Sequence, residues 1–158
     1  MSNRKFINVI VYRIKWKMKL QKKELSIQQN KVLEFIYRWI RPIRAGDLSK
    51  EMNIKHTTMN SQLKSLEEKE LIEWDRYGPI KLTTKGLNTA KHLNRHHGIL
   101  ENFMIEILGM DKNDAQVETL SLAPIVSCNF VNSIGKKFEL PTICACGSEI
   151  PTKRECLD

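Results

Sequence analysis

The order of two short helices and a hairpin within residues 42–86 constrains the fold more than any other feature of this 158-residue chain. The first helix is expected over residues 47–52. A tight turn separates it from a second helix that opens at Thr57 and Thr58, either of which can cap that helix through its hydroxyl group. Two helices joined by such a turn are typical of a helix-turn-helix motif.

A hairpin is expected directly after the second helix. Residues 72–74 and 80–82 alternate between apolar and polar side chains, as half-buried strands do, and the turn between them contains Gly78 and Pro79. Lys81 is directed outward from its strand. A hairpin in this place is the wing of a winged helix-turn-helix, so the sequence predicts a DNA-binding domain.

The second helix combines an apolar stripe with a polar face. Met59, Leu63 and Leu66 follow helical spacing and can pack on the preceding helix. The opposite face and the wing carry side chains that hydrogen-bond to bases and phosphates, although a solvated face of a small helical domain has a similar composition. The candidate DNA-binding residues are Lys55, His56, Thr57, Thr58, Asn60, Ser61, Lys64, Arg76, Tyr77 and Lys81.

The formal charge of +8 is concentrated in a basic N-terminal extension, residues 1–24, which holds eight Lys or Arg against Glu24 alone. Residues 10–20 alternate with a period of two, which favours a strand over an amphipathic helix. The extension can follow DNA phosphates, pair with a partner strand or touch anionic lipid. Alternatively, Met18 is the natural start and most of the extension is dispensable.

Helices are expected on both sides of the motif, so the fold class is mainly α with a small β wing. The first runs from about residue 26 to residue 40, with Val32, Leu33, Ile36, Trp39 and Ile40 on its core side. The second is long, capped by Thr83 and ended by Gly109.

The composition bounds the cellular setting. No apolar run is long enough to span a membrane. The four cysteines fit no framework of a small secreted protein, so reduced thiols and a cytoplasmic location are expected.

Two histidine-containing pairs lie on the long helix. His97 and Glu101 are i, i+4 neighbours that can hold one ion together, and His92 and His96 form a second such pair on a different face. Solvated helix surfaces also produce such pairs. Gly98 in mid-helix costs about 1 kcal/mol relative to Ala, which indicates close packing there.

Several runs of residues together resemble the iron- and manganese-dependent repressors of the diphtheria toxin repressor family, which includes the manganese transport regulators. These runs are Leu82-Thr83-Thr84-Lys85-Gly86, Arg95-His96-His97, Leu100-Glu101, Ile107-Leu108-Gly109-Met110-Asp111 and Cys144-Ala145-Cys146-Gly147-Ser148-Glu149-Ile150-Pro151. The resemblance covers roughly residues 27–151. It implies an N-terminal winged helix-turn-helix, a helical dimerisation domain, and DNA affinity switched by a divalent metal, Fe²⁺ or Mn²⁺.

The resemblance carries over only part of the family's ligand set. His97 matches a metal ligand, Glu101 a ligand of the ancillary site, and Glu34 a ligand carboxylate. Other ligand positions hold Leu120, Ala123 and Pro124, which offer no suitable side chain, and Lys31 stands where an acid is usual. With Glu118 as a nearby carboxylate, the resemblance implies a reduced metal site of His97, Glu101, Glu34 and Glu118.

The cysteines offer an alternative metal site. Cys128, Cys144, Cys146 and Cys156 supply four thiolates, the number that a tetrahedral Zn²⁺ or an iron–sulfur cluster requires. Their spacings match no standard cluster run. A thiol-redox switch, or simply buried thiols followed by an unstructured tail, remains open at this point.

Four segments are therefore expected. They are the basic extension (1–24), a winged helix-turn-helix domain (25–90), a helical dimerisation and metal-sensing domain (91–142), and a Cys-containing C-terminal tail (143–158). A homodimer would double the DNA contacts and place two recognition helices about one DNA turn apart. The candidate dimer-core residues are Leu120, Leu122, Ile125, Val126, Phe130, Val131, Ile134 and Phe138.

The expected function is a metal-responsive transcriptional regulator, a repressor that binds a double-stranded DNA operator. An iron–sulfur or thiol-redox sensor is one alternative, and a metal-independent DNA-binding module that has lost its sensor is another. The chain shows no glycine-rich phosphate loop, nucleophile elbow or HExxH run, so an enzyme is not expected.

Overall fold

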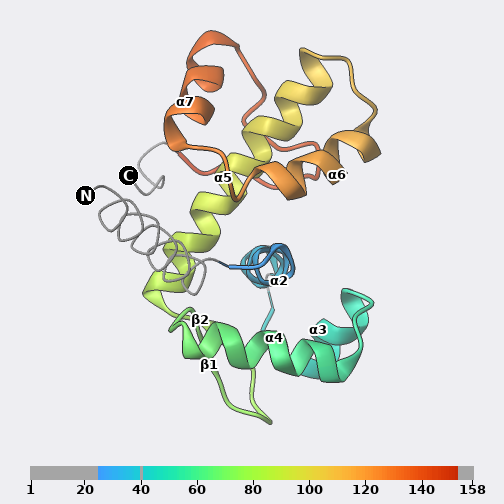
Figure 1. The fold of residues 1–158 in the computed structure, drawn as a ribbon, viewed down its shortest axis with the longest axis vertical. Helices are drawn as coiled ribbons and strands as arrows, with labels where there is room; N and C mark the ends of the chain where they lie inside the picture. Colours follow the sequence, from blue (N-terminus) through green and yellow to red (C-terminus); the bar gives the residue numbers. More distant parts are fainter. Residues whose placement is uncertain (1–24, 40, 153–158) are drawn as a thin grey trace, which may run out of the picture.

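One long helix, α5 (Thr84–Glu106), connects the two halves of the chain in a computed structural model that describes residues 25–39 and 41–152 (Figure 1). The mainly α fold class is confirmed, since the described residues form six helices and one two-stranded sheet. The elements before α5 are α2 (Ile27–Arg38), α3 (Ala45–Glu51), α4 (His56–Glu68), β1 (Ile72–Trp74) and β2 (Ile80–Leu82). Those after it are α6 (Lys112–Leu122) and α7 (Cys128–Lys137). The expected strand and start site in the basic extension lie outside the described residues.

The helix-turn-helix forms as predicted from α3 and α4. Asn53 adopts φ 51° in the turn, a left-handed conformation that asparagine tolerates better than most residues. The Ser49 hydroxyl donates to the carbonyl of Ile54 across the same turn and so fixes the angle between the helices. Figure 1 shows α4 crossing beneath α2, with the hairpin beside it.

The apolar stripe of α4 is confirmed, because Met59, Leu63 and Leu66 are fully buried. They pack with Val32 and Leu33 of α2 in the core of the first half. Burying each such side chain contributes about 1.5–3 kcal/mol to the free energy of folding. This burial leaves the opposite side of α4 facing solvent.

Two expectations at helix ends were wrong. Neither Thr57 nor Thr58 caps α4, because the helix starts one residue earlier with Lys55 at the N-cap and no side-chain cap bond. Both threonines therefore lie inside the first turn. Trp39 is not on the core side either, since α2 ends at Arg38 and Trp39 remains 36% exposed while stacking on Phe35.

The wing forms with the predicted residues. Strands β1 and β2 pair antiparallel, with Glu73 opposite Lys81. Ile43, which precedes α3, adds a short antiparallel bridge to Ile80 and so anchors the wing. The turn carries Tyr77, which is 86% exposed.

The start of α5 is fixed against the end of α4. Thr83 is the predicted N-cap, and its hydroxyl accepts a hydrogen bond from the amide of Gly86. Gly86 lies against the carbonyl of Leu71, so closely that a Cβ atom there would be 1.8 Å from this oxygen. At the far end, the helix finishes at Glu106 and Gly109 follows with φ 67°.

The second half packs α6, α7 and residues 143–152 on α5. Val131 and Ile134 of α7 are buried within the same chain, so they are not available for a dimer interface. Ile125 and Phe130, in contrast, are 76% and 51% exposed. The predicted close packing at Gly98 is confirmed, because a Cβ atom there would lie 2.5 Å from Ile150 Cγ1. No helix in the described residues has the length and apolar character that crossing a lipid bilayer requires.

We predict that Gly86→Ala lowers the free energy of unfolding by about 1–3 kcal/mol or more, because the added methyl group must displace backbone rather than a flexible side chain. The matched control is Gly46→Ala in α3, where a Cβ meets nothing within 4 Å. It should stabilise the protein by about 0.5–1 kcal/mol. Urea denaturation of both variants measures the difference, and equal midpoints would contradict the close approach.

Candidate metal centre and DNA-binding surface

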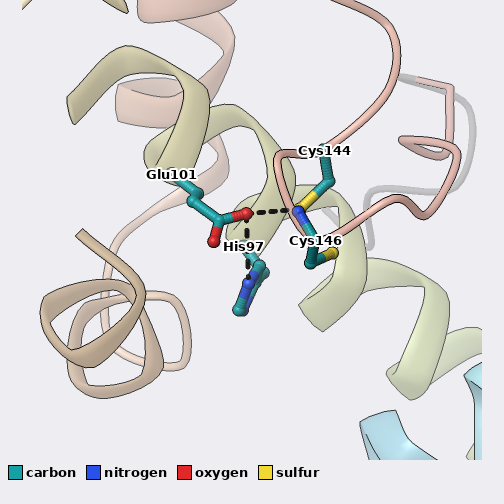
Figure 2. A group of neighbouring side chains, drawn as sticks. All are labelled: His97, Glu101, Cys144 and Cys146. Atoms are coloured by element: carbon teal, nitrogen blue, oxygen red, sulfur yellow. Dashed lines mark hydrogen bonds and ion pairs between the residues drawn. The ribbon is translucent and has the colours of Figure 1, made fainter. Parts of the chain in front are cut away.

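Four side chains of metal-ligating type converge between α5 and the loop that follows α7 (Figure 2). His97 and Glu101 come from successive turns of α5, and Cys144 and Cys146 come from the loop. Their candidate ligand atoms all lie within 4.8 Å of one another, and the first three residues are buried. His97 Nε2 is 3.7 Å from Glu101 Oε2, so the predicted i, i+4 pair does share one face.

The cysteine loop is a tight turn whose backbone points at its own sulfur atoms. The amide of Gly147 donates to the carbonyl of Cys144 at 2.7 Å, and Gly147 adopts φ 89°, which a glycine tolerates best. The amide of Cys146 donates to Cys144 Sγ at 3.3 Å. An amide that donates to sulfur favours the thiolate, which is the form that binds metals, whereas here Cys144 itself donates its thiol hydrogen to Glu101.

Asn102 holds this loop against α5. Its Nδ2 atom donates to the carbonyls of Pro141 and Ile143 at 3.0 and 2.9 Å, and its Oδ1 atom accepts from the amide of Ala145 at 3.1 Å. Asn102 is buried. One side chain therefore fixes the loop on both sides of Cys144.

Helix α2 supplies a fifth candidate ligand from the DNA-binding half. Glu34 is buried, and its Oε2 atom is 4.0 Å from His97 Nδ1. Arg38, one turn further along, lies 3.9 Å from the same carboxylate oxygen and donates through Nε to Asn94 of α5 at 2.7 Å. The centre thus joins α2, α5 and the cysteine loop.

Several polar atoms of this cluster are buried without a hydrogen-bond partner, namely both ring nitrogens of His97 and Glu101 Oε1. Leaving one such group unsatisfied costs about 1–3 kcal/mol. A cation coordinated by these atoms would remove that cost. The residues present therefore fit a metal ion.

Electrostatics within the cluster favour the charged form of Cys146 and Glu101 and the neutral form of Cys144 and Glu34. Interaction with Cys144 lowers the pKa of Cys146 to about 5, while the same interaction and burial raise the pKa of Cys144. Burial acts to raise the pKa of Glu101, but contacts with His97 and the Cys144 thiol outweigh it and the pKa is lowered. Burial also raises the pKa of Glu34.

The donor set is softer than the resemblance implied. Thiolate and imidazole ligands suit Zn²⁺ and Fe²⁺, whereas Mn²⁺ prefers oxygen ligands. One imidazole nitrogen, one carboxylate oxygen and two sulfur atoms can complete a tetrahedron around one ion. A mononuclear centre is therefore the arrangement that these residues allow.

The structure separates other candidate ligands from this group. Glu118 is exposed on α6, because Ala115 and Thr119 occupy the inward face of that helix. Cys128 lies with His92 and His96 in a different group, so the four cysteines do not converge within the described residues. Cys156 lies outside them.

The residues at the positions of the family's other expected ligands are buried or partly buried and offer no metal-binding side chain. Ala123 is buried, and its carbonyl lies 3.1 Å from His96 Nδ1. Leu120 and Pro124 are partly buried beside it.

The N-terminal part of α4 and the wing form the candidate DNA-binding surface. Asn60 is partly buried, with Nδ2 3.2 Å from His56 Nδ1, and the other predicted DNA-binding residues are exposed. No acidic residue occurs from Lys55 to Lys64, whereas Glu67 and Glu68 follow at the C-terminal end of α4. The charge therefore favours DNA contact through the N-terminal half of the helix.

A groove runs between α4 and the hairpin. Its walls include Asn60, Ser61, Lys64, Trp74 and Arg76. Tyr77 extends from the tip of the same hairpin. Side chains from two elements can thus reach a duplex on one side of the molecule.

Sequence reasoning missed Arg38 and Asn102, which position the centre without serving as ligands. Neither residue belongs to a motif. One signal could have identified Asn102. It directly follows Glu101 and is a polar residue on the buried face of a helix. Its partners lie about 40 positions away in the chain, where no local pattern reveals them.

Two family models match adjacent parts of the chain. Residues 83–152 match the iron dependent repressor, metal binding and dimerisation domain, and residues 25–76 match the MarR family. An HTH-type transcriptional regulator of Methanocaldococcus jannaschii is 33% identical over 99 residues, which cover 60% of this chain and 79% of the relative. The HTH-type transcriptional regulator MntR of Listeria welshimeri is 25% identical over 92 residues, covering 58% of this chain and 64% of MntR.

Among solved structures, the manganese regulator SloR superposes with a TM-score of 0.71 at 25% identity. The superposition covers 79% of this chain and 60% of SloR, so this chain spans about three fifths of that relative. The fold and these matches define a winged-helix transcriptional regulator with a metal-binding and dimerisation domain. The chain belongs to the diphtheria toxin repressor family of metal-dependent repressors, as its sequence motifs indicated. These are transcriptional regulators and not enzymes.

We predict that Asn102→Ala lowers metal affinity about 10–100-fold, although Asn102 is not a ligand, because the loop carrying Cys144 and Cys146 loses its fixed position. Competition titration with a chromophoric chelator measures this affinity. The control is Asn113→Ala, at an exposed position on α6, which should leave the affinity unchanged. Wild-type affinity in Asn102→Ala would show that the loop is positioned by other contacts.

Proposed function

We propose that this protein is a dimeric repressor that binds operator DNA when a divalent metal occupies the centre of His97, Glu101, Cys144 and Cys146. The observation that carries the proposal is the set of buried, unpartnered donor atoms at a place where the two halves of the chain meet. The family match supports the regulatory role, and the chemistry of the residues supports the metal site.

The position of the centre suggests how a metal would change DNA affinity. Glu34 belongs to α2, which packs on α4, while His97 and Glu101 belong to α5. A cation would attract Glu34 towards α5 and so fix the winged helix relative to the dimerisation domain. A coupling free energy of about 1–3 kcal/mol is enough for a useful change of affinity.

A second copy of the chain would place two α4 helices on one duplex. Recognition helices about 34 Å apart enter successive major grooves on one side of B-form DNA. Ile125 and Phe130 are exposed apolar side chains in the second half, and they support this half as the dimer contact. A regulator of chromosomal DNA would act in the cytoplasm.

The proposed metal is Fe²⁺ or Zn²⁺ rather than Mn²⁺, because two thiolates and an imidazole favour the later metals of the Irving–Williams order. Elemental analysis and an absorption spectrum of anaerobically purified protein test this proposal. The expected result is bound iron or zinc, with one ion at this centre and no visible cluster spectrum. A brown protein absorbing near about 400 nm would instead indicate an iron–sulfur cluster ligated by thiolates.

A metal-independent DNA-binding module is the second candidate, and the apolar residues Leu120, Ala123 and Pro124 at family ligand positions favour it. Such a module would bind DNA equally well after treatment with a chelator. Gel-shift titrations with and without chelator separate the two functions.

We predict that Lys64→Ala weakens DNA binding and flattens its salt dependence, with a loss of about 0.9 in the log–log slope if one phosphate contact disappears. Lys64 is exposed on α4 beside the groove that includes Arg76. The control is Lys112→Ala at the exposed start of α6. Fluorescence anisotropy at several salt concentrations gives both quantities, and an unchanged titration would argue against α4 as the reading helix.

We predict that Cys146→Ser impairs metal binding, in contrast to Lys64→Ala, which impairs DNA binding directly. Loss of one thiolate should lower Fe²⁺ or Zn²⁺ affinity about 10-fold or more and abolish the response of DNA binding to metal, since fewer ligands hold the ion. Lys64→Ala should keep wild-type metal affinity. Isothermal titration calorimetry with metal, followed by anisotropy with DNA, separates the two defects. Metal-dependent DNA binding by Cys146→Ser would remove the cysteine loop from the proposed centre.

A further inference from the structure

A second group of metal-ligating side chains lies on the same long helix, away from the centre described above. His92 and His96 occupy successive turns of α5, and Cys128 is the first residue of α7. Their candidate ligand atoms lie within 4.8 Å of one another. We propose that these three residues form a separate Zn²⁺ site that joins α5 to α7.

The distances are short for side chains from two elements. The rings of His92 and His96 are 4.1 Å apart between centroids, and Cys128 Sγ is 3.8 Å from His92 Nδ1. Two imidazole nitrogens and one thiolate sulfur are ligands that Zn²⁺ prefers, while Ca²⁺ and Mg²⁺ require oxygen. Three protein ligands leave the fourth tetrahedral position for water or another donor.

His96 is already oriented as a zinc ligand. Its Nδ1 atom lies 3.1 Å from the carbonyl of Ala123, and a carbonyl can only accept, so Nδ1 carries the proton. In the neutral ring the lone pair is then on Nε2. Metal-binding histidines commonly donate their other ring nitrogen to a backbone carbonyl in this way, which fixes both tautomer and ring orientation.

Burial and access suit a bound ion at this group, whereas the nearby charge of Arg95 opposes it. His96 is fully buried, whereas His92 and Cys128 are partly exposed, so an ion can enter from their side. Arg95 lies on the same helix and is buried, and its positive charge opposes a second cation. When a metal ion binds, Cys128 would coordinate it as a thiolate and supply the compensating negative charge.

The two sites are distinct because their side chains leave different faces of α5. His96 and His97 are consecutive, and consecutive residues differ by about 100° around a helix. His97 faces the cysteine loop, while His96 faces Ala123 at the end of α6. An ion at one site cannot use the ligands of the other without breaking the helix.

Zinc stoichiometry of the full-length chain tests the proposal. After chelator treatment and dialysis against Zn²⁺, we expect two equivalents in the wild type and one in both Cys128→Ser and His92→Gln. Cys146→Ser should lose the other equivalent. Asn129→Ser, beside Cys128 and exposed, is the matched control and should keep both.

Cobalt substitution supplies a spectroscopic test that a purely structural role of Cys128 would not satisfy. With Co²⁺ in place of Zn²⁺, the difference spectrum between wild type and Cys128→Ser should contain a sulfur-to-cobalt charge-transfer band. Wild-type zinc content in both Cys128→Ser and His92→Gln, with no spectral difference, would overturn the proposal. Metal-dependent DNA binding by Cys146 variants tests the regulatory centre separately.

Discussion

The continuity of α5 is the constraint on which the rest of the structure depends. The helix has 23 residues and a length of about 34 Å. Its orientation is set beside the wing and determines where the second half of the chain lies. At its start, Thr83 caps the helix and Gly86 presses on the backbone of Leu71. One continuous helix therefore joins the turns that carry His97 and Glu101 to the start of α5 beside the hairpin.

The proposed metal centre places polar side chains in the interior, and these cost free energy of folding when no ion is bound. His97, Glu101 and Glu34 are buried polar residues, and apolar residues of similar size would pack there at lower cost. The buried polar atoms of His97 and Glu101 lack hydrogen-bond partners. A cation bound at this junction between the two halves would remove the cost of leaving them unsatisfied. The surrounding contacts hold these side chains together without an ion. The main ones join Asn102 to the cysteine loop and Arg38 to Asn94.

Much of the first half could be predicted from sequence because its signals are local. The stripe of Met59, Leu63 and Leu66, the limits of both strands and the Thr83 cap all follow from spacing within a few residues. The predicted caps at Thr57 and Thr58 were wrong for a local reason as well. The helix begins at His56, before the first threonine, so neither hydroxyl group is at the N-cap position.

The centre itself could be predicted only in part. The pairing of His97 with Glu101 is a property of one helix, whereas their meeting with Cys144 requires a chain reversal of more than 40 residues. Grouping all four cysteines was an inference from number alone. The helix directions instead bring Cys128 to a different face of α5 from the cysteine loop.

Leu120, Ala123 and Pro124 stand at positions where the family has metal ligands. In this chain the cysteine loop supplies candidate ligands instead. Ala123 is buried, and its backbone carbonyl lies 3.1 Å from His96 Nδ1, a contact between the end of α6 and α5. Within α6 itself, Ala115 and Thr119 are the buried residues. The cysteine loop supplies its candidate ligands without being helical, because Asn102 fixes it on both sides of Cys144. The proposed centre combines this loop and α5 with Glu34 of α2, so a cation bound there would hold the two halves together.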